Sequence, residues 1–225
     1  MTAEAGFLGE ILRVETEPGI VLQATVGYQD DTPVDRLLVI FPPHPSLGGD
    51  SDNNVVRALF QRAVARNLLA VTFDYRGVRE GRVGDISLLT YWDRLEAAQD
   101  YSPIVSDALC LIRRVRDSFH SQAALWFAAY SFGNLVALAA AQKVEVHGIA
   151  GISPPLLAHD FEPWLGGKPA PIFWAAPGDV FCPAEAWEAL GQRQLDVRCF
   201  PAEDHFFRGV ENEVADAVLE ALLGA

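Results

Sequence analysis

Ala129-Tyr130-Ser131-Phe132-Gly133 is the stretch that decides what this chain can fold into. An apolar run at residues 123–128 precedes it, and the helix-forming run Leu-Val-Ala-Leu-Ala-Ala-Ala at residues 135–141 follows it. A buried strand is therefore expected to turn into a helix at Ser131. Such a bend requires small residues two positions before and after the serine, because larger side chains would collide across it. Ala129 and Gly133 meet this requirement, so the stretch matches the small-x-Ser-x-Gly pattern of a nucleophile elbow.

Working outward from this stretch, strand-like apolar runs alternate with helix-like runs. Strands are expected at residues 36–41, 68–75, 147–152, 172–176 and 197–200, and helices at residues 53–66, 104–119, 184–192 and 210–223. Two further strands, residues 11–16 and 20–26, flank the turn sequence Glu17-Pro18-Gly19 and predict an antiparallel edge. Alternation of this kind indicates an α/β fold with a doubly wound, mostly parallel sheet. We expect residues 1–225 to form a single domain without a large cap.

Residues 78–100 do not follow this alternation. They begin rich in glycine and charge and continue as Thr90-Tyr91-Trp92-Asp93-Arg94-Leu95-Glu96, which suits a short helix. The pair Ser102-Pro103 follows them. It predicts that Ser102 caps the next helix and that Pro103 occupies its first position.

Composition limits the partners and the location of the protein. The net charge of −13 argues against a nucleic-acid or anionic-membrane partner, and no apolar run approaches the length of a membrane span. Residues Met1 to Glu10 lack the basic start and apolar core of a signal peptide, so we expect a cytoplasmic protein. Its state is expected to be a monomer or a small homo-oligomer. The three cysteines contain no C-x-x-C pair, which favours reduced thiols and implies no metal site.

A serine hydroxyl is a poor nucleophile until a base removes its proton and a third group orients that base. His205 directly follows the last predicted strand, where a base above the sheet edge has to stand. Asp179 directly follows the strand before it and is the first choice for the orienting acid. Asp160, in an irregular loop, and Asp204, adjacent to the histidine, are the alternatives.

Hydrolysis through a serine also requires two N–H donors for the oxyanion. The backbone N–H of Phe132, directly after the serine, is the first. The second is expected from the loop at residues 42–49, in which three prolines have no N–H. This leaves His44, Ser46 and Leu47, with His44 as the first choice. For substrate contacts we expect Leu47, Trp164 and Phe206, the tryptophan lying in a loop rich in apolar residues between 153 and 171.

Taken together, these pieces resemble the α/β-hydrolase superfamily, and most of all its small bacterial members related to dienelactone hydrolases. The matching motifs are His44-Pro45-x-x-Gly48-Gly49, Phe73-Asp74-Tyr75-Arg76-Gly77, Tyr130-Ser131-Phe132-Gly133, Asp179 to Pro183, and Asp204-His205-Phe206-Phe207. The resemblance implies Ser131, Asp179 and His205 as the triad. Three features depart from the pattern: Pro42 in place of a histidine, Ala129 in place of the first glycine, and the longer segment 78–100.

The expected function is that of a serine hydrolase. It would cleave a carboxylic ester or related acyl bond of a small molecule through an acyl-enzyme, with no cofactor. The alternative, from another class, is a binding or scaffold protein that keeps the fold without useful turnover, because a fold alone does not decide function. Asp74 and Arg76 are expected to fix loop geometry through charge-assisted hydrogen bonds and to take no part in the chemistry.

Overall fold

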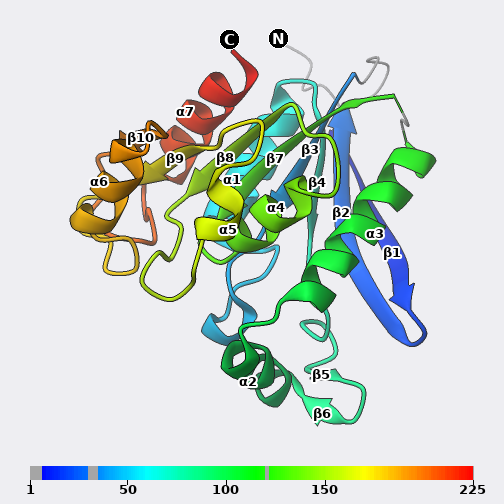
Figure 1. The fold of residues 1–225 in the computed structure, drawn as a ribbon. Coiled ribbons are helices and arrows are strands. Elements are labelled where there is room, and N and C mark those ends of the chain that lie inside the picture. The colour runs from blue at the N-terminus through cyan, green and yellow to red at the C-terminus, as the bar shows by residue number, and fades with distance from the viewer. Residues whose placement is uncertain (1–6, 30–34, 120–121, 225) are drawn as a thin grey trace.

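The computed structural model describes residues 7–29, 35–119 and 122–224, so most of the segment Met1–Glu10 lies outside the described residues. The described residues form an eight-stranded sheet (Figure 1). Its order is β1 (Phe7–Glu17), β2 (Ile20–Gln29), β4 (Leu69–Phe73), β3 (Arg36–Phe41), β7 (Ala124–Tyr130), β8 (Gly148–Ile152), β9 (Ile172–Ala175) and β10 (Asp196–Cys199). The pairings β1–β2 and β2–β4 are antiparallel, and the others are parallel. The predicted parallel sheet with an antiparallel N-terminal edge is confirmed.

Helices cover both faces of the sheet (Figure 1). On one face, α1 (Asn54–Ala65) packs beside α7 (Glu211–Leu223). On the other, α3 (Ser102–Ser118) packs beside α4 (Gly133–Ala141), and the short α5 (Glu162–Leu165) contacts α4. The remaining helix α6 (Ala184–Gln192) contacts β10, and a 3-10 turn η1 (Pro45–Leu47) follows β3.

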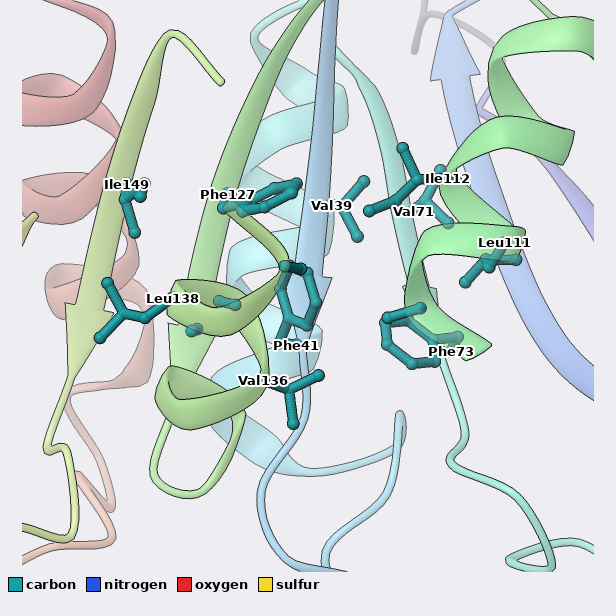
Figure 2. Packing of buried hydrophobic residues seen from close by; sticks show 14 of the residues in the cluster. Val39, Phe41, Val71, Phe73, Leu111, Ile112, Phe127, Val136, Leu138 and Ile149 are labelled. Atoms are coloured by element: carbon teal, nitrogen blue, oxygen red, sulfur yellow. The ribbon is translucent and has the colours of Figure 1, made fainter. Parts of the chain in front are cut away.

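Strict alternation of side chains in the central strands builds two hydrophobic cores. In β7, Leu125, Phe127 and Ala129 face the core under α3 and α4, whereas Trp126, Ala128 and Tyr130 belong to the core under α1 and α7. Figure 2 shows the first core, with Val39, Phe41, Phe127 and Val136 packed between sheet and helices. Because both faces are buried, these strands read in the sequence as continuous apolar runs.

The short helix expected within residues 78–100 is present, and a hairpin that the sequence did not indicate precedes it. The segment forms a small hairpin, β5 (Arg82–Val83) with β6 (Ile86–Ser87), and then a helix α2 (Leu88–Ala98). Ser87 caps this helix, since its side chain accepts a hydrogen bond from the Thr90 N–H. Trp92 is fully buried, so α2 is docked onto the body of the protein through that ring.

The predicted start of α3 was wrong by one position. The N-cap is Tyr101, and Ser102 is the first helical residue. Its N–H donates to the Asp100 carboxylate at 2.9 Å, so an aspartate side chain supplies the hydrogen bond that the serine was expected to make. The α5 helix was not predicted either, because a single turn has too few residues to show a helical period in the sequence.

The turn after β4 is fixed by two ion pairs, in agreement with the structural role expected for Asp74 and Arg76. The buried Arg76 guanidinium donates two hydrogen bonds of 2.6 Å to the buried Asp107 carboxylate of α3. The Asp74 carboxylate accepts from the Ser51 N–H at 2.9 Å and from the Arg79 guanidinium. These contacts join the ends of β4 and α3 to the loop before α1.

Among the described residues, no helix combines the length and the apolar character that crossing a membrane requires. All three cysteines are free thiols. Burial raises the pKa of the Cys182 thiol to about 12, which keeps it protonated and unreactive at neutral pH.

The buried ion pair predicts an asymmetric response to mutation. Asp107→Asn should lower the free energy of unfolding by up to about 3–5 kcal/mol, because it leaves the buried Arg76 charge with only the half-exposed Glu17 carboxylate as a counter-ion. The matched control is Asp196→Asn in the exposed Arg198–Asp196 pair, which should change it by less than about 1 kcal/mol. Urea unfolding followed by circular dichroism measures both. Equal effects of the two substitutions would refute the role given to Arg76 and Asp107.

Candidate active site

The bend between β7 and α4 has the geometry of a nucleophile elbow. Ser131 has a φ of +53°, a conformation that non-glycine residues rarely adopt. A Cβ on Gly133 would lie 2.3 Å from the Phe41 carbonyl oxygen and 2.7 Å from that of Pro42, so only glycine fits there. The small residue is thus required by the end of the neighbouring strand β3, and not only by the bend itself. The sharp turn leaves Ser131 at the carboxyl edge of the parallel strands.

Hydrogen bonds to the next strand hold the elbow in place. The Ser131 N–H donates to the Ile152 carbonyl of β8 at 2.9 Å. The buried Asn134 side chain donates to the carbonyls of both Ser131 and Ile152, at 2.8 and 2.9 Å. A Cβ on Gly151 would lie 2.1 Å from the Asn134 side-chain oxygen, which explains the glycine in β8. These hydrogen bonds therefore hold Ser131 in its strained backbone conformation.

Three side chains predicted from separate strand ends come together here. His205 Nε2 lies 3.0 Å from Ser131 Oγ, and His205 Nδ1 lies 3.0 and 2.9 Å from the two oxygens of Asp179. All three are buried, with exposed fractions of 7% for Ser131, 6% for His205 and 2% for Asp179. These contacts are consistent with a catalytic triad.

The environment of Asp179 keeps its carboxylate charged. Burial alone would raise its pKa, but hydrogen bonding and charge interaction with His205 lower it below the usual range. Backbone N–H groups of Phe181 and Cys182 also donate to one oxygen, at 2.9 and 3.1 Å. An acceptor held in this way fixes the imidazole with its Nδ1 protonated and its Nε2 free to accept the serine proton.

The two alternative carboxylates occupy other positions. Asp160 accepts a hydrogen bond from the Glu162 N–H at 2.9 Å, at the start of α5. Asp204 accepts one from the Phe206 N–H, also at 2.9 Å. Both side chains therefore stabilise turns of their own loops.

Tyr130 positions the histidine loop, and sequence reasoning missed this residue. Its hydroxyl donates to the His205 carbonyl at 2.8 Å, and its ring stacks on the imidazole with centroids 5.4 Å apart. The alternation of side chains in β7 could have indicated this role, because it directs Tyr130 to the face of the sheet opposite Ala129. A Cβ on Gly178 would lie 2.1 Å from the Glu203 carbonyl oxygen. Glycine at this position therefore allows the loops that carry Asp179 and His205 to approach each other closely.

The loop after β3 contains two candidate N–H donors already in use and one that is free. The Ser46 N–H donates to His44 Nδ1 at 3.1 Å, and the Leu47 N–H donates to the His44 carbonyl at 3.2 Å. Within the part of the chain that the structure describes, the backbone N–H groups of His44 and Phe132 have no acceptor. The His44 ring packs edge-on against the Phe132 ring, with centroids 4.9 Å apart, so this loop lies against the elbow.

Two buried histidines flank Phe132, one of them unexpected. His159 lies against the Phe132 ring at 5.5 Å, and its Nδ1 is 3.3 Å from the Tyr101 hydroxyl. His44 Nε2 lies 2.8 Å from a Glu96 carboxylate oxygen of α2, without the alignment of a hydrogen bond. Burial lowers the pKa of both histidines and outweighs the opposing charge of Glu96. Both rings are consequently neutral at neutral pH.

The residues expected to bind substrate lie in different places. Leu47 and Phe206 are exposed, by 77% and 44%, in loops at the carboxyl edge of the sheet. Trp164, in α5, lines a groove between α3 and α4 whose lining contains none of the three hydrogen-bonded residues Ser131, Asp179 and His205. Leu157 and Val180, two further exposed apolar side chains, belong to loops that follow β8 and β9. These four exposed apolar side chains, Leu47, Leu157, Val180 and Phe206, stand in loops at the carboxyl edge of the sheet, the edge that also carries Ser131, and are called the apolar rim below.

The described residues contain no group of three or more histidine, cysteine or acidic side chains arranged to hold a metal ion.

No protein-family model and no curated protein matches the sequence. Solved structures do match. An α/β serine hydrolase homologue from Coxiella burnetii superimposes with a TM-score of 0.76 at 22% identity, covering 95% of this chain and 97% of that one. An α/β serine hydrolase without a lid from Xanthomonas campestris gives a TM-score of 0.75 at 20% identity over 94% and 92%. Est1E from Butyrivibrio proteoclasticus gives 0.71 at 15% identity over 95% and 98%.

At these identities the likeness establishes the fold. The strand order, the antiparallel edge and the Ser131 elbow agree with it. This chain has the α/β-hydrolase fold, and the residues that the structure describes form no separate cap domain.

Proposed function

We propose that this protein is a serine hydrolase that cleaves a carboxylic ester or related acyl bond of a small molecule. The observation that carries the proposal is the continuous hydrogen-bonded series from Ser131 Oγ through His205 to Asp179. Ser131 Oγ attacks the acyl carbon while His205 Nε2 takes its proton and then gives it to the leaving alcohol. Water, deprotonated by the same nitrogen, then cleaves the acyl-enzyme. The sheet from β1 to β10 supports treating residues 1–225 as one catalytic domain.

For the oxyanion, we assign the backbone N–H groups of Phe132 and His44. Both lack an acceptor among the described residues, and the packing of the two rings keeps the loop beside the elbow. Donors that are already fixed before the reaction stabilise the developing charge without reorganisation. The prolines at 42, 43 and 45 restrict the loop backbone and thereby support this assignment.

The alternative is a scaffold protein without turnover. A scaffold has no need of a strained serine with φ of +53°, nor of a buried carboxylate whose pKa is lowered by a histidine. The strain at Ser131 costs stability, and a charged acceptor beside a histidine is what a nucleophilic serine requires, so the two features together favour the hydrolase.

The apolar rim supports a substrate with an apolar acyl or alcohol part. Its four members stand in the loops after β3, β8, β9 and β10, open to solvent. Without a lid to open, we expect short or medium acyl groups to be cleaved in solution, with no gain at a lipid interface. Ferulic acid is bound to Est1E in one of the similar structures, which makes an aromatic acyl ester a reasonable first substrate.

A fluorophosphonate probe should modify Ser131 and no other serine. The motive is the contact of its hydroxyl with a base, at 3.0 Å. Mass spectrometry of the labelled peptide identifies the site, and Ser131→Ala should remove the label. Ser46 and Ser153 serve as internal controls. Modification at either of them instead of Ser131 would overturn the assignment of the nucleophile, and absence of labelling in folded protein would favour the scaffold.

Asp179→Asn should lower kcat by roughly 10²–10⁴ while KM changes little, because the imidazole loses its orientation and the support of its positive form. The matched controls are Asp160→Asn and Asp204→Asn, which alter only turn capping and should each cost far less. Kinetics on one activated ester, with folding checked by circular dichroism, compare the three. Near-normal turnover of Asp179→Asn would rule out its assignment.

The rim should determine the preference for apolar substrates. Leu47→Ser and Phe206→Ser should each raise KM for a hexanoyl ester about fivefold, since the loss of one partly buried apolar contact is worth about 1 kcal/mol. KM for the acetyl ester should hardly change. Ile11→Ser is the control, because Ile11 is an apolar side chain in β1 whose exposed fraction of 60% lies between those of Leu47 and Phe206. Parallel changes for both esters, or a sharp rise in activity on emulsified long-chain triglyceride, would contradict the rim's role.

A further inference from the structure

A groove of about 1130 Å³ lies outside the proposed catalytic site, on the face of the sheet covered by α3, α4 and α5. Its size is ample for a small molecule. α5 is a single turn of four residues, so it covers little of the space beside α4. Figure 1 shows these three helices on the same side of the sheet.

The groove follows the helices along their length. α3 contributes a stripe at three- and four-residue spacing, from Ser102 through Val105, Leu109 and Ile112 to Arg116. This stripe spans roughly 20 Å at 1.5 Å per residue. α4 runs alongside and contributes Leu135 and Ala139, followed by Gln142 and Lys143 just beyond its end.

The middle of the groove is apolar and its far end is cationic. Val105, Leu109 and Trp164 are only partly buried against the core, so apolar surface remains open along the groove. At the carboxyl ends of α3 and α4, the lining changes to Arg113, Arg116 and Lys143, with Asp117 as the only acid there.

Cationic side chains in the last turn of a helix interact favourably with the helix dipole, so their presence alone indicates no ligand. In this protein, however, the three cations form no ion pair with any described residue, although the chain carries a net charge of −13. Arg116 donates one long hydrogen bond of 3.3 Å to the Ala123 carbonyl, and its buried Nε has no acceptor. The three cationic side chains therefore lie at the end of an open apolar channel.

We infer that this groove binds an amphipathic carboxylate, an aliphatic chain with one anionic end. The chain would lie along Val105, Leu109 and Leu135, and the carboxylate would meet Arg113, Arg116 and Lys143. An elongated apolar channel with cations at one end matches this chemistry in both length and charge. A neutral or cationic amphiphile would leave the cations unpaired or repelled.

The site is separate from the chemistry of Ser131. Tyr101, at the groove's other end, and Phe132 lie between them, with ring centroids 5.1 Å apart. Binding there does not depend on hydrolysis, and its test uses no activity measurement.

Isothermal titration of the full chain with decanoate tests the inference. Decanoate should bind at least about tenfold more tightly than either decyltrimethylammonium, which has the same chain and the opposite charge, or butyrate. The double variant Arg113→Glu with Lys143→Glu should weaken decanoate binding at least about tenfold. Ser106→Trp, at an exposed lining position, should do the same by filling the groove.

Two controls locate the site. Arg114→Glu changes an exposed neighbour on α3 that does not line the groove and should alter affinity less than about twofold. Leu47→Ser, in the rim near Ser131, should also leave it unchanged. Equal binding of the cationic amphiphile, an Arg114→Glu effect as large as that of the double variant, or loss in Leu47→Ser with retention in Ser106→Trp would each overturn the inference. Analytical sedimentation supplies one more test. If the unaltered protein is a dimer that Ser106→Trp dissociates, a second copy of the chain occupies the groove and the inference is overturned.

Discussion

The contact between Gly133 and the end of β3 is the constraint on which the rest of the site depends. With 2.3 Å between a would-be Cβ and the Phe41 carbonyl oxygen, α4 can begin only where the chain has no side chain. That fixes the first turn of α4 against the loop after β3, and with it the relation of Phe132 to His44. The strain at Ser131 is tolerated because Asn134 and the Ile152 carbonyl secure the bend from the other side.

The parallel strands bring the remaining residues of the site to the elbow. Ser131, Asp179 and His205 lie after β7, β9 and β10, and because these strands are parallel their carboxyl ends lie at one edge of the sheet. Residues 74 positions apart can therefore hydrogen-bond without a long loop. The acid and base are supported by their own strand ends, and the Tyr130 hydroxyl ties the histidine loop back to the central strand.

Much of this could be predicted because the relevant signals are local. β3 and α6 have the bounds expected from the sequence, since a run of buried apolar residues or a helical period determines such elements almost alone. Ser131, Asp179 and His205 were chosen from their places after strands, and the fold brings these three side chains together. What the sequence did not show depends on contacts distant in sequence: the helix expected around Thr90–Glu96 is docked as α2 by the burial of Trp92, and His159 is held against Phe132 by folding of the loop after β8. The start of α3 lies one residue earlier than expected because the Asp100 carboxylate accepts from the Ser102 N–H and the Tyr101 carbonyl accepts from the Val105 N–H, which places Ser102 inside the first turn.

Phe132 connects the two regions of the molecule that are open to ligands. Its ring is enclosed by His44, Tyr75, Trp92, Tyr101 and His159, so α2 and the loop after β8 both pack onto the residue next to the nucleophile. Tyr101 also lines the groove. Because interiors are close-packed, a displacement of Tyr101 bears first on the Phe132 ring, which belongs to the residue directly after Ser131. A groove ligand whose affinity differed between two positions of this pair would change substrate affinity, and substrate would change the affinity of that ligand by the same factor.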